Sequence, residues 1–394
     1  MNRMAMAGAV VAVLVAAAGC PAGECQTNAD CAQGKICNST NVCSDPNGPL
    51  PAQDASQPPP RDASRVDGSA ADSASQDLVG IDGGGTQVTS FAACSGVRAL
   101  AYDSSQDQLL VACETADTIV VYDAVTGVQQ RELTSLPVPC KPRALHLLAN
   151  RQQLWVACSD SGNQKVFNTD PQTGASNESG FGYTGIGGSA RFASSADRLV
   201  WTDASGSSYH LRAVGSATTS SLVADGSGLN LGNGVAMMTT GEFFMTNFLT
   251  ANGNITRRDK TNGVLTNYIA ATINNQLIAY SAVRSVLIIA SNAAYSRMNA
   301  ASGTVIGSAQ NFGPGTSARA LVVHPGGQHA FLARYSSSTA STLVDEISLD
   351  PADDTPTIST RSLGSCYGTD LAAAADGRVF VACANSNRIE VQSF

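Results

Sequence analysis

A strand-like apolar segment recurs seven times along the last three quarters of this 394-residue chain. The segments share a short apolar run that ends in small or polar residues, and they begin at Leu109, Leu154, Leu199, Phe243, Leu287, Ala330 and Val379. Successive starts lie 45, 45, 44, 44, 43 and 49 residues apart. A period near 45 leaves room for about four short strands in each repeat. The repeat therefore restricts this part of the chain to a series of small antiparallel sheets.

The first repeat indicates how each unit is built. Strands are predicted over 97–102, 109–113 and 118–122, with polar turns between them. A glycine closes the turn after the third strand at Gly127, Gly174, Gly263 and Gly303, where a positive φ is expected. The second strands are apolar on both faces, as expected for sheets packed between two neighbours. These features predict an all-β, seven-bladed β-propeller with four-stranded antiparallel blades.

The same residues resemble the YVTN family of seven-bladed propellers, which is named after a tetrapeptide of its second strand. The segment 244–247, Phe-Met-Thr-Asn, comes close to that tetrapeptide, and 155–158 and 380–383 keep its aromatic, aliphatic and small order. Residues 120–123, with Thr126 and Gly127, match the third strand and the turn after it in the family's repeat. The resemblance covers about three quarters of the chain and implies the propeller fold. Its members include lactonases, surface-layer proteins and binding lipoproteins, so it implies no single activity.

The last repeat is one strand short, which predicts how the ring closes. After Cys383 only one further strand fits, over 388–394. The segment 88–92 precedes the first repeat and is expected to supply the missing outermost strand, so that no sheet edge is left open. A solenoid with free caps would not show this deficit. The propeller is therefore expected to span residues 88–394.

Residues 1–19 are predicted to be an export signal. One positive charge, Arg3, precedes an uncharged apolar run over 4–18 that is short for a membrane span. Residues 15–20 resemble the bacterial lipobox, although Ala17 stands where the family prefers Leu, and this implies acylation of Cys20 and anchoring in a membrane. Pro21 replaces the aspartate of inner-membrane retention, which favours the outer membrane of a bacterial cell envelope. A plain secretory peptide cleaved elsewhere is the alternative.

The remaining ten of the eleven cysteines form an even set suited to an oxidising compartment. Within the lipid-anchored segment 20–43, Cys25, Cys31, Cys37 and Cys43 are spaced six residues apart. Two disulfides in any of three connectivities are expected to hold this segment, since it is too short for a core. A zinc site is the alternative, although zinc usually requires closer cysteine pairs. The segment resembles small cysteine-rich knots that precede linkers in some bacterial surface lipoproteins.

Residues 44–87 are predicted to be a disordered acidic linker rich in Pro, Ala and Ser. Six of the fifteen prolines lie there, together with seven aspartates and two arginines. This composition builds no packed core. A random coil of this length spans roughly 35 to 40 Å, and charge repulsion extends it. The linker is thus expected to hold the propeller away from the membrane.

Six cysteines in the propeller form three pairs of similar spacing: Cys94–Cys113, Cys140–Cys158 and Cys366–Cys383, which are 19, 18 and 17 residues apart. In a hairpin whose turn centres near residue 105, Cys113 lies opposite Val97, so a short curl of chain brings Cys94 within bonding distance. A disulfide within each blade is therefore predicted. The alternative joins neighbouring blades, as in Cys113 with Cys140. None of these cysteines forms a Cys-x-x-Cys redox pair.

Arginines recur where the first strands are expected to approach the propeller axis. Arg98, Arg143 and Arg319 each begin an Arg-Ala-Leu triplet 11 residues before the second strand, and Arg191 is a weaker fourth case. Asp370, Asn233 and Asn275 begin first strands in other blades. Guanidinium groups gathered in one funnel would attract a carboxylate or phosphate. Alternatively, each arginine only bridges adjacent blades through a carboxylate or a carbonyl.

These features predict an extracytoplasmic ligand-binding or protein-interaction module. Its expected partners are the membrane, through acyl chains on Cys20, and either an anionic small molecule or a protein or cell-surface partner. A lactonase-like hydrolase and an outer-membrane assembly scaffold are the alternatives, and enzymatic activity is less favoured than binding. No catalytic residue, metal ligand or cofactor is predicted, and structural or surface roles are expected for His146, His210, His324 and His329. Nucleic acid is disfavoured because 23 basic residues face 31 acidic ones. A monomer is expected.

Overall fold

The computed structural model describes most of the propeller and two short strands before it. The described residues are 36–37, 43–44, 89–136, 140–148, 153–160, 163–176, 181–182, 191–202, 208–214, 221–224, 231–247, 254–270 and 277–394. The chain divides into two compact units, residues 1–80 and 81–394. In the first unit, β1 (Ile36–Cys37) pairs antiparallel with β2 (Cys43–Ser44). The predicted export signal, Cys20, the cysteine connectivity of 20–43 and the linker 44–87 apart from Ser44 lie outside the described residues.

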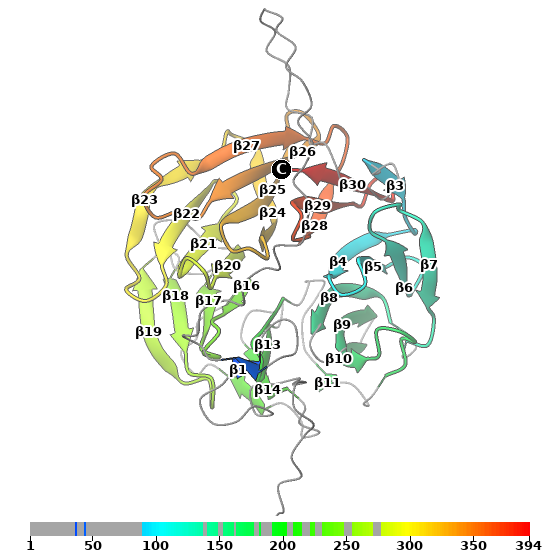
Figure 1. Cartoon of the computed structure of the whole chain (residues 1–394), viewed down its shortest axis with the longest axis horizontal. Helices are drawn as coiled ribbons and strands as arrows, with labels where there is room; N and C mark the ends of the chain where they lie inside the picture. Colours follow the sequence, from blue (N-terminus) through cyan, green and yellow to red (C-terminus); the bar gives the residue numbers. More distant parts are fainter. Residues whose placement is uncertain are drawn as a thin grey trace, which may run out of the picture. The chain divides into compact units, whose positions relative to one another are not determined.

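The second unit consists of seven four-stranded antiparallel sheets, which are the blades of a propeller (Figure 1). We number the blades 1 to 7 in the order in which their innermost strands occur in the chain. The innermost strands are β4 (Val97–Asp103), β8 (Pro142–Leu148), β12 (Phe192–Ser194), β16 (Leu231–Met237), β20 (Leu277–Ser281), β24 (Thr316–Val323) and β28 (Gly368–Ala373). The second strands are β5 (Gln108–Cys113), β9 (Gln153–Asp160), β13 (Arg198–Thr202), β17 (Phe243–Asn247), β21 (Val286–Ala290), β25 (His329–Ser336) and β29 (Arg378–Cys383).

The two outer strands complete each blade. The third strands are β6 (Thr118–Asp123), β10 (Asn163–Thr169), β14 (Ser208–Ala213), β18 (Asn254–Arg258), β22 (Ala294–Asn299), β26 (Ser341–Ser348) and β30 (Arg388–Ser393). The outermost strands are β7 (Gln129–Leu133), β11 (Phe181–Gly182), β15 (Ser221–Ala224), β19 (Leu265–Ala270), β23 (Val305–Asn311), β27 (Thr357–Ser362) and β3 (Ser90–Ala92). The seven apolar segments identified in the sequence are the second strands, so the predicted number of blades and strands is confirmed.

The ring closes as the missing strand predicts. β3 pairs with β30 in the seventh blade, with Ser90 opposite Glu390 and Ala92 opposite Arg388. The innermost strands of neighbouring blades contact one another around the whole circle, including β28 with β4. Blade 7 is therefore built from both the beginning and the end of the propeller sequence, and β3 pairs with the edge of β30 that would otherwise be open.

The hydrophobic core lies between the blades. Every residue of β5, β21 and β29 is buried, because each second strand is covered on both faces. The cluster between blades 7 and 1, for example, joins Leu109 and Val111 to Phe380 and Ile389. Full burial of an aliphatic or aromatic side chain contributes about 1.5 to 3 kcal/mol, so the ring is stabilised mainly by the contacts that each blade makes with its neighbours.

The turn between the third and fourth strands depends on glycine. All four predicted glycines have positive φ, at 68° for Gly127, 75° for Gly174, 69° for Gly263 and 72° for Gly303. Space is restricted as well, since a Cβ at Gly127 would lie 2.7 Å from the ring of Phe91 in β3. At the start of the same turn the carboxylate of Asp123 accepts the backbone N–H groups of Val125 and Thr126, at 3.1 and 2.8 Å. Sequence and backbone geometry therefore agree at this turn.

The three cysteine pairs of the propeller are disulfide-bonded within their blades. The Cα atoms are 5.8 Å apart in Cys94–Cys113, 4.8 Å in Cys140–Cys158 and 5.0 Å in Cys366–Cys383. Val97 lies opposite Cys113, as the hairpin argument predicts. The disulfides belong to blades 1, 2 and 7, which are consecutive in the ring because blade 7 contacts blade 1.

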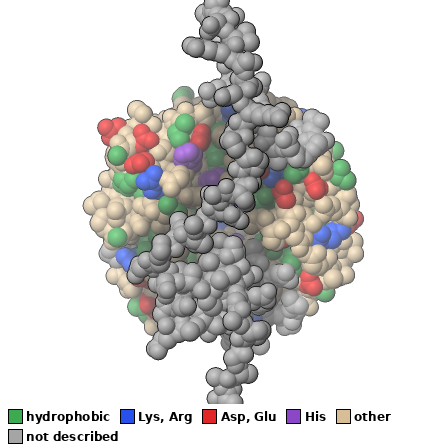
Figure 2. Space-filling model, viewed as in Figure 1, with side chains coloured by type: hydrophobic (Ala, Val, Ile, Leu, Met, Phe, Trp, Pro, Cys, Tyr) green, Lys and Arg blue, Asp and Glu red, His purple; other side chains and the backbone are tan. Residues whose placement is uncertain are grey.

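Polar contacts join blade 7 to blade 1. The side chain of Arg378 is only 6% exposed and donates hydrogen bonds to the backbone oxygen of Ala124 and to the carboxylate of Asp107, both at 2.8 Å. The side-chain oxygen of Asn387 accepts the N–H of Gly96 at 2.9 Å. On the visible face, charged side chains stand in small separate groups among uncharged ones (Figure 2). No helix among the described residues is long and apolar enough to cross a membrane.

Candidate functional site

The predicted arginines occupy the same special position in three innermost strands. The pairing of β4 with β5 shifts by one residue at Arg98, that of β8 with β9 at Arg143, and that of β24 with β25 at Arg319. Blade 7 has the same shift at Thr369. Such β-bulges insert one unpaired residue and redirect its side chain. The recurring Arg-Ala-Leu triplet therefore reflects a bulge at the start of the innermost strand.

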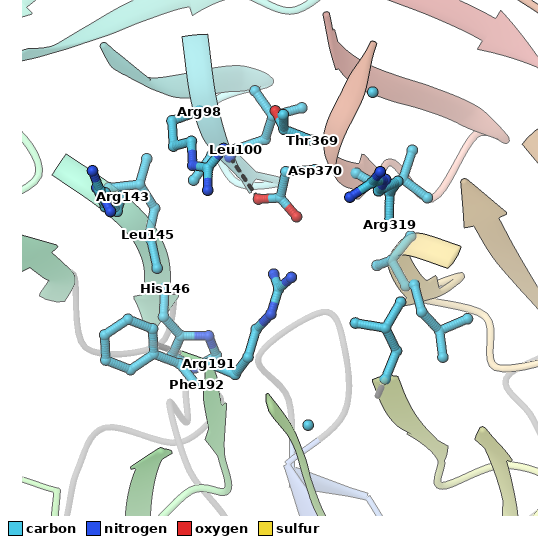
Figure 3. A pocket seen from close by; sticks show the side chains of 18 of the residues that line it. Arg98, Leu100, Arg143, Leu145, His146, Arg191, Phe192, Arg319, Thr369 and Asp370 are labelled. Carbon is cyan, nitrogen blue, oxygen red and sulfur yellow. Dashed lines mark hydrogen bonds between the residues drawn. The ribbon is translucent and has the colours of Figure 1, made fainter. Parts of the chain in front are cut away.

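An axial cavity of about 390 Å³ lies where these bulges meet (Figure 3). All seven blades contribute to its lining. Arg98, Arg143, Arg191 and Arg319 all line it, and Asp370 is the one carboxylate among the described lining residues. Aliphatic residues complete the wall, namely Leu100, Leu145, Val235, Leu277, Ile278, Leu321, Val322 and Leu371. The structure thus brings the four predicted arginines and Asp370 together in one concave site.

Two of the arginines share a carboxylate that the sequence analysis did not single out. Glu114 follows the second strand of blade 1 and accepts hydrogen bonds from Arg143 Nε at 2.9 Å and Nη2 at 2.5 Å. Arg98 Nε lies 3.8 Å from the other oxygen of the same carboxylate. Arg143 belongs to blade 2, so it bridges adjacent blades, as the structural alternative predicts. Glu114 directly follows Cys113, which pairs opposite Val97, and this register is the signal that places it beside Arg98.

Arg319 is held by aromatic rings. Its guanidinium lies 5.8 Å from the ring centre of Tyr335 and 4.9 Å from that of Tyr367, and the two rings contact each other edge to face. Tyr335 belongs to blade 6, whereas Tyr367 precedes β28 in blade 7. Within the described residues, no carboxylate lies within ion-pair distance of Arg319. Its charge is fixed in position and stays available to the cavity.

Asp370 points into the cavity near Arg191 and Arg98 (Figure 3). One carboxylate oxygen accepts the backbone N–H of Leu100 at 2.9 Å, across the junction of blades 7 and 1. Burial raises the pKa of Asp370, while Arg191 and then Arg98 act in the opposite direction. Neither arginine forms a direct ion pair with it in the described structure. Asp370 therefore stands among the arginines as a partly desolvated carboxylate.

His146 also lines the cavity, which the sequence analysis did not predict. Its Nε2 lies 2.7 Å from the hydroxyl of Ser194, and its ring stacks on Phe192. Burial lowers the pKa of His146 to about 4, so the imidazole is neutral at pH 7. A base this weak, with no carboxylate to orient it among the described residues, does not resemble an activated Ser-His pair. The signal that could have located it is its position three residues after Arg143 in the same innermost strand.

The side chains of the two predicted asparagines, Asn233 and Asn275, lie outside the described part of the structure, so their roles stay predictions. Asn233 belongs to β16, but the placement of its side chain lies outside the description, and Asn275 falls outside the described residues entirely. His210, His324 and His329 do not line the cavity. Across the described ranges, no cluster of three His, Cys, Asp or Glu side chains is arranged to hold a metal ion. The site is thus defined by arginines, one aspartate, aromatic rings and aliphatic walls.

Comparison with known proteins identifies the fold. No protein-family model matches the chain, and no curated protein matches it in sequence. The structure is similar to the β-propeller domain of Cps50 (Swd1) from Myceliophteria thermophila, with a TM-score of 0.59 and 11% identity over 76% of this chain and 98% of that one. Raptor from Chaetomium thermophilum gives 0.62 and 14%, over 78% of this chain and 28% of that one. A chain of the Mitotic Checkpoint Complex gives 0.57 and 15%, over 84% and 99% respectively.

Proposed function

We propose that this protein is an exported, lipid-anchored binding module of the bacterial cell envelope whose axial cavity binds an anionic small molecule. The observation that carries the proposal is the convergence of Arg98, Arg143, Arg191 and Arg319 on one cavity. A propeller is consistent with a binding or protein-interaction role, and the fold does not define the ligand. The site must therefore be argued from its charges and shape.

The chemistry of the cavity favours a carboxylate or a phosphate. Guanidinium groups donate paired hydrogen bonds to such oxyanions, and a concave site with low-dielectric walls strengthens the attraction. Arg319 has no carboxylate partner among the described residues, whereas Arg143 is already bonded to Glu114. We therefore expect Arg319 to contribute more to ligand affinity than Arg143.

A thermal-shift screen of the full chain against small anions tests the binding proposal. A ligand that binds the folded state raises the melting temperature, because it stabilises that state by an amount that grows with the logarithm of the ligand concentration relative to Kd. We expect a positive shift with one or more anions and its loss in the triple variant R98A/R143A/R319A. Because Arg143 also bridges blades 1 and 2, the single variant R319A serves as the sharper comparison. If the triple variant binds the same anions with unchanged affinity, the arginines are not the site.

The proposed membrane anchor rests on the apolar run 4–18 and on Cys20. Two acyl chains on Cys20 would hold the protein at a membrane stably, and the linker 44–87 would separate the propeller from the surface. Expression of the full chain in a bacterial host with labelled fatty acid tests this anchor. We expect label in the intact protein and none in C20S, which should move to the soluble fraction. A labelled C20S variant, or an unlabelled wild type, would refute lipidation at this cysteine.

A further inference from the structure

The axial cavity holds more positive charge than its described residues neutralise. Four arginines line it, and Asp370 is the one carboxylate in the described lining. Glu114 supplies a second carboxylate through its contacts with Arg98 and Arg143. His146 adds no charge at neutral pH, because its pKa lies at about 4. Among the described side chains, four guanidinium groups thus face two carboxylates, which leaves an excess of two positive charges.

The excess is distributed unevenly around the axis. Among the arginines, Arg191 exerts the larger electrostatic effect on the pKa of Asp370, followed by Arg98. Glu114 forms its close contacts with Arg143 and lies 3.8 Å from Arg98. Arg319 has neither carboxylate within ion-pair distance. Arg98 has the Glu114 carboxylate at 3.8 Å and Arg191 acts on Asp370, so the least neutralised group is Arg319 in blade 6 (Figure 3).

Asp370 occupies a position where the arginine-bearing blades have alanine. The bulge residue is followed by Ala99 in blade 1, by Ala144 in blade 2 and by Ala320 in blade 6. In blade 7 the bulge residue Thr369 is followed by Asp370. The hydrogen bond from the N–H of Leu100 fixes this carboxylate in the cavity wall. A fixed negative charge there repels every anionic group in the cavity, so it reduces the net positive charge that the arginines offer to a ligand.

We propose that the cavity selects dianions over monoanions, with Arg319 as a principal ligand contact and Asp370 as the residue that reduces the net positive charge available to the ligand. This inference rests on the proposed binding function of the cavity. Dicarboxylates and tetrahedral dianions such as sulfate or a phosphate monoester share the required chemistry. The two classes differ in the distance between their negative charges. A dicarboxylate carries two separate charged groups, whereas sulfate or a phosphate monoester carries both charges on one compact group.

Calorimetric titration of the full chain at neutral pH and constant ionic strength tests the selection. Succinate is compared with succinamate, which has the same length and one charge fewer, and sulfate is compared with methanesulfonate. We expect the dianion of at least one pair to bind about tenfold more tightly than its monoanion. Preference within the succinate pair alone indicates a dicarboxylate site, and preference within the sulfate pair alone indicates a compact tetrahedral site.

Three variants assign the selection to residues. R319Q removes one charge and should lower the dianion preference about tenfold, whereas R319K keeps the charge and should retain the preference with weaker binding of both probes. D370N keeps an oxygen that can accept the N–H of Leu100 and should tighten the binding of both anions. R361Q is the matched control, because Arg361 lies on the outermost strand β27, where it stacks over Phe394. It should bind like the wild type.

The outcomes separate this inference from the proposed function. If no anion binds to the wild type, both proposals are wrong. If anions bind but each monoanion matches its dianion, the cavity binds anions and the charge selection is wrong. If R319Q leaves the preference unchanged, or if D370N weakens the binding of both probes, the assigned residues do not set the selection.

Discussion

Blades 7, 1 and 2 and blades 3, 4 and 5 form the same kind of sheet but are held together differently. The first group carries all three disulfides of the described structure. The second group relies on packing, for example of Trp201 in blade 3, which stacks on His210 of the same blade and, across the boundary of the two groups, on Trp155 of blade 2. The described cavity wall differs too, since blades 4 and 5 contribute only Gly234, Val235, Leu277 and Ile278. The cross-linked group thus provides Arg98, Arg143 and Asp370, whereas these two blades provide apolar surface.

The comparison indicates why the cross-links lie where they do. In blades 1, 2 and 7, one cysteine of each disulfide pairs opposite the residue just before the bulge, as Cys113 does opposite Val97. A bulge interrupts the ladder of hydrogen bonds at that point. The disulfide fixes the same end of the hairpin. Arg98, Arg143 and Asp370 therefore project from backbone that is covalently restrained, as a preorganised binding site requires, whereas the bulge at Arg319 in blade 6 has no disulfide beside it in the described structure.

Removal of all three disulfides should cause the largest loss of stability, and this loss should fall mainly on blades 7, 1 and 2. Each closed loop of 17 to 19 residues contributes about 3 kcal/mol, so replacing the six cysteines by alanine should lower the free energy of unfolding by roughly 9 kcal/mol. Urea denaturation measures this loss. Hydrogen exchange should accelerate first in blades 7, 1 and 2. Equal acceleration in blades 3 to 5 would mean that the cross-links do not act locally.

Loss of the aromatic contacts of Trp201 should be the next largest effect, and it should act on blade 3 and on its boundary with blade 2. Trp201 is fully buried, so W201A should destabilise the protein by about 4 kcal/mol through the lost contacts and the resulting cavity. W201F should lose less, because it retains part of the stacking. Its effect should add to that of removing Cys94–Cys113, because the two sites have no common contact. A strongly non-additive double variant would show that the two groups are coupled.

Acidification should weaken the junction of the two groups through His146. The folded pKa of about 4 lies below the ordinary value of 6.5, so the unfolded chain binds the proton first. Stability from this group is full above pH 6.5 and falls as the pH drops towards 4, by roughly 3 kcal/mol in total. Urea denaturation between pH 7 and pH 4.5 measures the loss. H146Q should lack this component, and the same pH dependence in both proteins would refute the assignment.

A single hydrogen bond between blades 7 and 1 should give the smallest effect. Asn387 has a positive φ of 48° and accepts the N–H of Gly96 through its side chain. N387G keeps the backbone conformation and loses the bond, which should cost about 1 kcal/mol. N387A should cost more because alanine is strained at this φ. Thermal denaturation of the two variants compares the contributions, and equal loss in both would mean that the backbone strain is negligible.

Much of the fold was predictable because a blade requires a repeated pattern. The apolar second strands fixed the period, and the missing strand after Cys383 predicted the pairing of β3 with β30. The disulfides were predictable from hairpin register, since Cys113 lies opposite Val97. These features depend on local sequence patterns, on the number of strands in each repeat and on the register of single hairpins. They could therefore be derived without knowledge of the folded ring.

The site was only partly predictable, because it depends on how the ring brings distant residues together. The spacing of Arg98, Arg143 and Arg319 indicated equivalent positions but not that each lies at a bulge, since one inserted residue leaves no compositional signal. The sharing of Glu114 crosses from blade 1 to blade 2. His146 contacts Ser194 and Phe192 of the next blade, and these contacts depend on the packing of blade 2 against blade 3. The roles proposed for Asn233 and Asn275 stay predictions.

The pairing of β3 with β30 also has a mechanical consequence. A pull on the chain ahead of Ser90 is transmitted first to three residues, 90–92, which are joined side by side to the last strand of the propeller. The bonds of this short pair therefore bear the tension before any other blade is loaded. Under sufficient force the ring should open at this one place, while the six sheets built from continuous sequence remain intact.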